Sequence, residues 1–429
     1  MFRLAIRRAA TSAPSLSRLQ KPLWGSHPST VRSFGTTNGS DSSNPVALQM
    51  INYALGHART QKSEESYAQA LLVLEQGLAN LRQADSADED GVGMVLLAMS
   101  TLLSEREQFN DAMEKLQMVL DLGRSSLGMR VAAYEGLIGL HLEAGQDVTS
   151  SILADKCLQL FTSRPENEGN AIEDLYIRAN AIKGLVELVV GNIVSAELHF
   201  RMHQFNDLLE DKWYMGNVAL SHGEFLHATG HFALAKDFYQ KAVKASEIHG
   251  SSEASTLAAA NIISGEVSLE ATCALGQLAT HSGNFTDAEE ILTKALTKAE
   301  EHFGSSHPNV GVVLTCIAIM FGHKAKMERS SSILIQEGLY RRAIDLLKAP
   351  SLDFEVAEMP AARRDILALA RGGYAEVLCV QQNRKGEGER MKKWAEYVWR
   401  NRRLSLADAL EITEPSKVAI IDARVHRVI

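Results

Sequence analysis

The sequence predicts an all-α protein in which helix–turn–helix units stack into an α-solenoid. Proline is scarce, with 9 in 429 residues, and residues that favour helices, such as Ala, Leu and Glu, are abundant. An alternation of Val and Ile suited to a strand occurs only at the end of the chain. Small and aromatic residues recur at fixed helical offsets in several stretches, a pattern that indicates helices crossing closely.

Residues 1–34 have the composition of an organellar transit peptide. They contain six basic residues and no acidic residue, and Arg3, Arg7 and Arg8 border the apolar side of a short predicted helix. Arg32-Ser33-Phe34 resembles a mitochondrial processing site. We therefore expect a mitochondrial protein, in the matrix or associated with the inner membrane. Chloroplast import is the alternative, because the two kinds of transit peptide share this composition.

The charge balance disfavours nucleic acid as a partner. Without the six basic residues of the leader, 38 basic residues remain against 52 acidic ones, a formal charge of −14. From Arg363 onward, 14 basic residues exceed 9 acidic ones, so the negative charge lies in the body of the chain. A body of this sign repels phosphate.

A flexible linker rich in Gly, Ser and Asn is expected at 35–45, followed by a helical repeat array at 46–348. The clearest unit is residues 275–296. There, Gly276 and Ala288 stand where two helices would approach, and Gly283 stands where the first helix must end. The same offsets recur at Gly223, Leu226, Gly230, Phe232, Ala235, Tyr239 and Ala242, and less strictly elsewhere. The predicted turns fall at positions 107, 145, 191, 230, 283 and 325.

These residues resemble the tetratricopeptide repeat (TPR), a helix–turn–helix unit that stacks into a superhelix. Residues 275–296 and 223–243 carry the resemblance most clearly. The segment after the first of them, with Gly304 and His307-Pro308, is similar to the linker of kinesin-light-chain-type repeats. The resemblance implies a TPR-like α-solenoid that binds other proteins along its concave face.

Three further segments follow the array. Residues 349–362 contain Pro350 and Pro360 and read as a linker. Residues 363–411 predict a C-terminal helical cap, which contains Trp394 and Trp399. The tail, residues 412–429, is apolar enough to dock or to pair with something.

No set of residues predicts catalysis, a cofactor or a metal. The four cysteines are far apart and favour buried, reduced thiols. His199 and His203 have helical spacing but lack a third metal ligand. Phosphate-loop and nucleophile motifs are missing. We expect no transmembrane segment, because the longest apolar stretches are about half a membrane span, and no small-molecule substrate.

The candidate partner-binding residues belong to the first helices of the two clearest repeats, which the resemblance places on the concave side: Asn217, Glu224, His227, Gln277, Thr280 and His281. The lysines with which related repeats hold a terminal carboxylate are missing from the matching positions. If the concave face binds a partner, changing Glu224 and Gln277 to lysine should remove that partner and leave thermal stability close to wild type, as expected of surface substitutions.

The sequence thus favours a non-enzymatic mitochondrial scaffold or adaptor that binds partner proteins, in the assembly or maintenance of a mitochondrial complex. The alternatives are an organellar factor for RNA processing or expression, and a helical enzyme with unrecognised chemistry.

Overall fold

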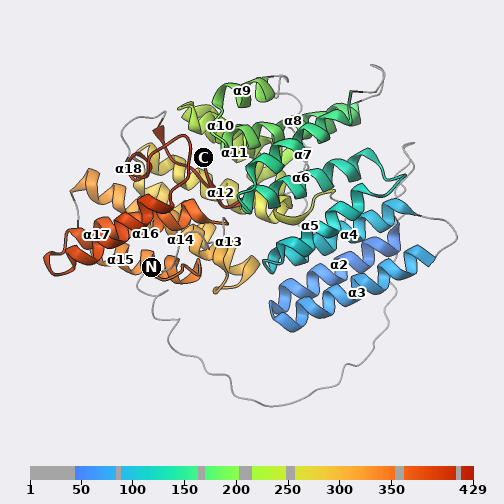
Figure 1. Cartoon of the computed structure of the whole chain (residues 1–429), viewed down its shortest axis with the longest axis horizontal. Coiled ribbons are helices and arrows are strands. Elements are labelled where there is room, and N and C mark those ends of the chain that lie inside the picture. The colour runs from blue at the N-terminus through green and yellow to red at the C-terminus, as the bar shows by residue number, and fades with distance from the viewer. Residues whose placement is uncertain are drawn as a thin grey trace, which may run out of the picture. The chain divides into compact units, whose positions relative to one another are not determined.

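The computed structural model describes residues 44–83, 88–162, 170–201, 215–247, 257–329, 331–352, 362–411 and 417–429 (Figure 1). The predicted transit peptide, at 1–34, lies outside the described residues. So do most of the two predicted linkers and His203 of the histidine pair considered above. Residues 43–429 form one compact unit, and the description below concerns this unit alone.

Helices in successive pairs make up most of the described chain. The pairs are α2 (Pro45–Gln61) with α3 (Glu64–Gln83), α4 (Glu89–Glu105) with α5 (Phe109–Leu120), α6 (Leu127–Glu143) with α7 (Asp147–Gln159), α8 (Asn170–Val189) with α9 (Ile193–Arg201), α10 (Gly216–Ala228) with α11 (Phe232–Glu247), α12 (Ser264–His281) with α13 (Phe285–Phe303), α14 (Pro308–Glu328) with α15 (Ile333–Leu346), and α16 (Arg364–Cys379) with α17 (Lys385–Val398).

Each helix packs against the next along the chain, and the first helices of neighbouring pairs also pack against one another, as α10 does with α8 and α12. The first helices therefore form an inner layer and the second helices an outer one. Burial follows this arrangement, since almost every residue of α10 is buried, whereas α11 buries one face only. The predicted all-α solenoid is confirmed.

Most turns within the pairs have the geometry that their glycines predict. Gly145, Gly191, Gly230 and Gly283 all have positive φ angles between 70° and 84°. After Gly283, the amide of Asn284 donates to the carbonyl of Ala279 at 2.9 Å, which closes the end of α12. The turn expected at 325 is wrong. Ala325 continues the helix, and α14 ends only at Arg329, whose φ is 50°.

Glycine also permits the close crossings expected from the sequence. A Cβ atom added to Gly276 would lie 2.5 Å from Cγ of Leu292, and one added to Gly223 would lie 2.7 Å from the Tyr239 ring. A Cβ atom added to Gly184 would likewise lie 2.6 Å from Cζ of Phe200. In all three pairs the glycine precedes its large partner by 16 positions, so one packing solution is repeated along the array.

The region expected as a cap is a further helix pair. Helices α16 and α17 pack together, and α16 also contacts α14 and α15. A short helix, α18 (Leu406–Ala409), packs on α16, and the chain ends in two short antiparallel strands, β1 (Ile421–Asp422) and β2 (Arg427–Val428). These strands lie in the part of the sequence that showed strand-like alternation.

Helix α14 is the one helix of the described residues with the length and composition to cross a membrane. It packs against α12, α13, α15 and α16. Of its most apolar 18-residue window, 67% is buried within the unit, which is typical of a core helix.

Two irregular segments cover the inner layer. Residues 257–263, which include the 3₁₀ turn η3 (Ala260–Ile262), pack against α4, α6 and α12. The second segment is residues 418–429, which we call the tail hairpin. Its strand β1 contacts α12 and its strand β2 contacts α16. The inner face of the repeats is therefore filled by the chain itself.

Candidate functional site

The tail hairpin is a short, buried β-ribbon. Ile421 pairs with Val428 and Asp422 with Arg427, and the backbones of Ile420 and Ile429 exchange hydrogen bonds of 2.8 and 3.0 Å. The Asp422 carboxylate accepts from the amides of Arg424 and Val425, which fixes the turn between the strands. This local pairing presents the turn side chains to the inner helices.

Arg424 is the centre of the contact with α10. Its side chain is fully buried, and its Nη2 donates to Glu224 Oε2 and Asp422 Oδ2, both at 2.8 Å. Nη1 donates to Asn217 Oδ1 and to Ser221 Oγ. Residues four and seven positions apart share one face of a helix, so α10 offers these three side chains as a single surface. We call Asn217, Ser221 and Glu224 the arginine site.

Helix α12 contacts the backbone of the hairpin. The Gln277 amide accepts from Ile421 N at 2.8 Å and donates to Ile421 O at 2.9 Å. Seven positions earlier, Glu270 accepts a hydrogen bond from the amide of Ala423. A side-chain amide that pairs with the backbone N–H and C=O of one residue can hold an extended strand of almost any sequence.

The remaining contacts lie at the two ends of the hairpin. His426 bonds to Glu143 at the end of α6, and Arg427 forms an ion pair with Asp147 at the start of α7, at 2.6 Å. On the other side, Arg403 donates to Ile429 O at 2.9 Å. The hairpin is thus held by residues of three repeats and of the segment after α17.

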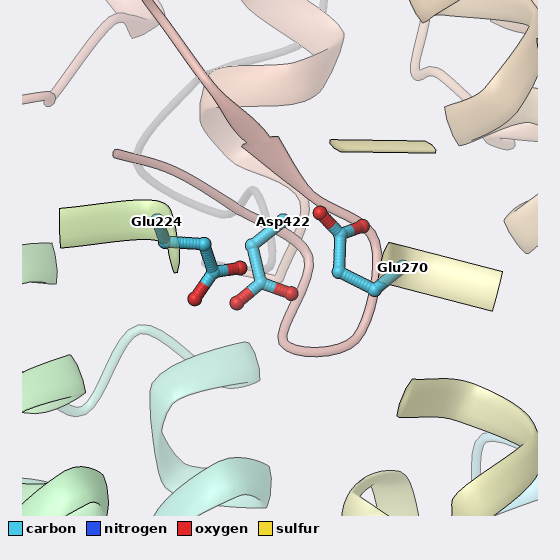
Figure 2. Close-up of side chains that lie close together, drawn as sticks. All are labelled: Glu224, Glu270 and Asp422. Carbon is cyan, nitrogen blue, oxygen red and sulfur yellow. The ribbon is translucent and has the colours of Figure 1, made fainter. Parts of the chain in front are cut away.

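Three carboxylates, from α10, α12 and the tail hairpin, lie close together (Figure 2). Glu224 of α10, Glu270 of α12 and Asp422 of the hairpin bring one oxygen each within 4.8 Å of the others. Burial raises the pKa of Glu224 and that of Glu270 well above the ordinary value of a glutamate side chain. Asp422 raises both further, and Arg424 partly opposes the shift. Among the described residues, Oε1 of each glutamate lacks a hydrogen-bond partner.

A proton fits this cluster better than a metal ion. Carboxylate oxygens are ligands for hard cations, but the Arg424 guanidinium already supplies positive charge to two of the three groups. Burial raises the pKa of Glu224 and of Glu270, which favours the protonated form of both carboxyl groups.

The structure places the six candidate residues on the inner face but does not leave that face open. Asn217, Glu224 and Gln277 contact the tail hairpin. Thr280 instead donates to the Gly276 carbonyl of its own helix, at 2.9 Å. The expectation of a solvent-exposed groove is wrong, because the chain's own hairpin covers it. The expectation that lysines at 224 and 277 leave stability unchanged is wrong for the same reason, since these side chains are 0% and 6% exposed.

The two candidate histidines contact each other. His227 Nε2 lies 2.9 Å from His281 Nδ1, and the other His227 nitrogen lies 3.1 Å from the Tyr239 hydroxyl. Burial, together with the charge of Arg403, lowers the pKa of His227 to about 3, so this ring is neutral. Both histidines therefore complete a polar contact between inner helices.

Arg424, Asp422 and Glu143 were not among the residues predicted from the sequence. The available signal was the alternation of apolar and charged residues in the tail, in which Arg424 and Asp422 interrupt an otherwise apolar strand pattern. Charged residues inside such a pattern require buried partners, and acidic residues on the inner helices are suitable ones.

Comparisons with known proteins agree with the repeat. A family model described as tetratricopeptide repeat matches residues 269–309, which run from α12 to the start of α14. A search of curated proteins found no match.

The chain also resembles solved structures. One is described as "Crystal Structure of Rap Protein Complexed with Competence and Sporulation Factor" and is 11% identical, with a TM-score of 0.38. The similarity covers 81% of this chain and 98% of that chain. The predicted likeness to kinesin-light-chain repeats stays a prediction. A tetratricopeptide-repeat model thus matches one helix pair of this chain and the start of the next, and the other described pairs pack in the same succession.

Proposed function

We propose that this protein is a non-enzymatic mitochondrial scaffold that holds extended segments of partner proteins against the inner face of its repeats. Assembly or maintenance of a mitochondrial complex is the role that we assign to it. The fold is one that serves protein interaction, and the rest of the proposal combines the inner face with the composition of residues 1–34.

One observation carries the proposal. The inner face holds an extended peptide segment, which it binds through its backbone at Gln277 and through a charged side chain at Glu224. A surface that can satisfy both the backbone and the side chains of a strand has the chemistry needed for peptide recognition.

The chemistry of the buried groups supports a role without catalysis. Burial raises the pKa of the Cys273 and Cys316 thiols well above the ordinary value, which disfavours reactive thiolates. Glu224 and Glu270, two of the buried carboxylates with raised pKa values, contact the hairpin.

Binding is tested by affinity purification of the full chain from intact mitochondria after chemical crosslinking. We expect specific protein partners whose crosslinks fall on α6, α10 and α12. Crosslinks confined to the outer helices would place binding elsewhere, and recovery of RNA in a salt-dependent manner would favour the RNA-processing alternative.

The mitochondrial address is tested separately. We expect that changing Arg3, Arg7 and Arg8 to glutamate leaves a fluorescent fusion of the full chain in the cytosol, because import depends on a basic amphipathic leader. Changing Lys392, Lys393 and Arg390 to glutamate is the matched control and should leave import intact. Unchanged import of the leader variant would contradict the address.

A further inference from the structure

We infer that the tail hairpin is an exchangeable occupant of the inner face, and that the partner segment which replaces it carries an arginine for the arginine site. This inference rests on the proposed function and adds to it the chemistry of the partner and a mode of regulation. In the free protein the hairpin covers the face, and a competing segment must displace it.

The backbone contacts are general enough to be taken over by another chain. Gln277 recognises Ile421 through its amide and carbonyl, and Glu270 recognises the amide of Ala423. A partner strand offers the same groups whatever its side chains. Only the position one residue beyond the second of these contacts, occupied by Arg424 in the hairpin, must supply a particular side chain.

That side chain is an arginine because of the shape and charge of the arginine site. Asn217 and Ser221 receive one guanidinium nitrogen while Glu224 receives the other, so three acceptors face a planar, forked donor. Lysine presents a single ammonium group and cannot meet both sets of acceptors at once. Glu143 and Asp147, which bind His426 and Arg427, extend the acidic lining toward α6 and α7.

The hairpin is an imperfect occupant, which favours exchange. It brings Asp422 as well as Arg424 into a site that already contains Glu224 and Glu270, so one guanidinium faces three carboxylates. Burial is the main cause of the raised pKa of Glu224 and of Glu270, and the charge of Asp422 raises both further. A partner segment with an uncharged residue in place of Asp422 avoids the repulsion and should bind more tightly.

The inference is tested with the full chain and three fluorescent peptides, by fluorescence anisotropy. The first peptide has the sequence of residues 418–429, the second carries Asp422→Asn, and the third carries Arg424→Ala. Asparagine keeps the side-chain oxygen that caps the turn, removes the charge, and replaces the oxygen that accepts from the Arg424 guanidinium. The chain is used as wild type, as Arg424→Ala to weaken its own hairpin, and as Arg390→Ala, an exposed arginine of α17, for control.

We expect the Arg424→Ala chain to bind the first peptide about tenfold or more tightly than the wild-type and Arg390→Ala chains, a difference of about 1.4 kcal/mol. The Asp422→Asn peptide should bind more tightly than the first, and the Arg424→Ala peptide should lose about tenfold or more. Equal, weak binding to all three chains, with the circular dichroism of the Arg424→Ala chain unchanged, would overturn the inference.

Hydrogen exchange of the wild-type chain decides the matter if the Arg424→Ala chain fails to fold. The amides of Ile421 and Ala423 should exchange much faster than those at the centre of α12, through local opening of the hairpin. Exchange of both sets at the same rate, only with global unfolding, would make the hairpin a permanent part of the fold and overturn the inference.

The two proposals fail in different ways. If mitochondrial partners purify equally with the wild-type and the folded Arg424→Ala chains and do not compete with the peptide, the scaffold function stands and the exchange inference falls. If no crosslinked partner is recovered while the peptide binds as expected, the proposed function falls and the inner face remains a site for arginine-bearing segments.

Discussion

Glu143 and Glu270 are both buried against the tail hairpin, yet their pKa values move in opposite directions. Burial raises the pKa of each. At Glu143, His426 and Arg363 outweigh burial and lower the pKa below its ordinary value. At Glu270, Asp422 and Glu224 add to burial and the pKa rises well above it. Both carboxylates are buried and belong to inner helices. The difference between their pKa values therefore depends on the charges that face each one.

The raised pKa predicts a loss of stability with rising pH that depends on Glu270. Between its ordinary pKa of about 4.3 and its raised folded value, Glu270 binds more protons in the folded chain than in the unfolded one. Stability therefore falls as pH rises through this window. Glu270→Gln cannot ionise, and its oxygen can still accept from Ala423. Urea unfolding across pH should show a shallower fall for this variant.

A control variant and the shape of the pH profile test whether the pH dependence of stability comes from Glu270. The exposed Glu396→Gln of α17 is the control and should keep the wild-type slope. Glu224 contributes to the fall of stability with rising pH in every variant, because its pKa is raised as well. A Glu270→Gln profile parallel to that of the wild type at all pH values would mean that Glu270 is ionised at neutral pH.

At the scale of the helix pair, Gly276 limits how closely α12 and α13 can cross. Gly276→Ala should lower the free energy of unfolding by about 1–3 kcal/mol, because the new methyl group overlaps Cγ and Cδ2 of Leu292. Gly338→Ala on α15 is the matched control, since nothing lies within 4 Å of its added Cβ. There, alanine should stabilise the helix by about 0.5–1 kcal/mol.

Urea denaturation midpoints of the two variants check this prediction. The shifts should have opposite signs, although both substitutions improve helix propensity equally. A rise in the midpoint for both would show that α12 and α13 can separate at no cost, and that the small residue at 276 is not required by the crossing.

The helix pairs could be predicted because each is specified within a few tens of residues. Gly283 ends α12, Asn284 caps α13, and Gly276 meets Leu292 only 16 positions later. The end of α14 could not be placed in the same way. Alanine at 325 is a good helix residue, so the inner helix continues for one more turn.

What covers the inner face could not be predicted from local pattern. Glu224 and Arg424 are 200 positions apart, and a polar helix face has the same sequence whether water or a strand lies against it. The candidate residues were identified by their place on the first helices, but their burial depends on the tail. Only the charged residues within the strand-like tail pointed to a buried partner.

At the scale of the whole described unit, contacts across the inner face join repeats that are distant in sequence. His307 Nε2 lies 3.1 Å from the Glu105 carbonyl, between α14 and α4. Arg363 and Lys348 pair with Glu107, and although burial opposes ionisation they lower the pKa of Glu107 to about 2. A linear repeat array contacts only its neighbours, so these additional contacts should make unfolding more cooperative.

Glu143 is the residue that joins most of these parts. It accepts from His426 of the tail hairpin, from Asn261 of the segment before α12, and from Arg363 at the start of α16. Glu143 is only 2% exposed, so water has little access to replace its carboxylate as a partner. The interactions that lower the pKa of Glu143 stabilise the fold above pH about 4.3. This contribution is lost as the pH falls through the pKa that Glu143 has in the folded chain.

Glu143→Gln should therefore lower the free energy of unfolding and also make unfolding less cooperative. Removing one member of a buried ion pair costs about 3–5 kcal/mol, and the lower end applies here because Arg363 keeps Glu107. We expect hydrogen exchange in increasing urea to show α4 and α16 losing protection together in the wild-type chain and separately in the variant, because the contacts that join them are weakened. Glu290→Gln, at an exposed i,i+4 pair on α13, should leave the two transitions together. If α4 and α16 still unfold together in Glu143→Gln, the cooperativity of the array comes from stacking between neighbouring helix pairs, and the contacts across the inner face only fix the position of the tail hairpin.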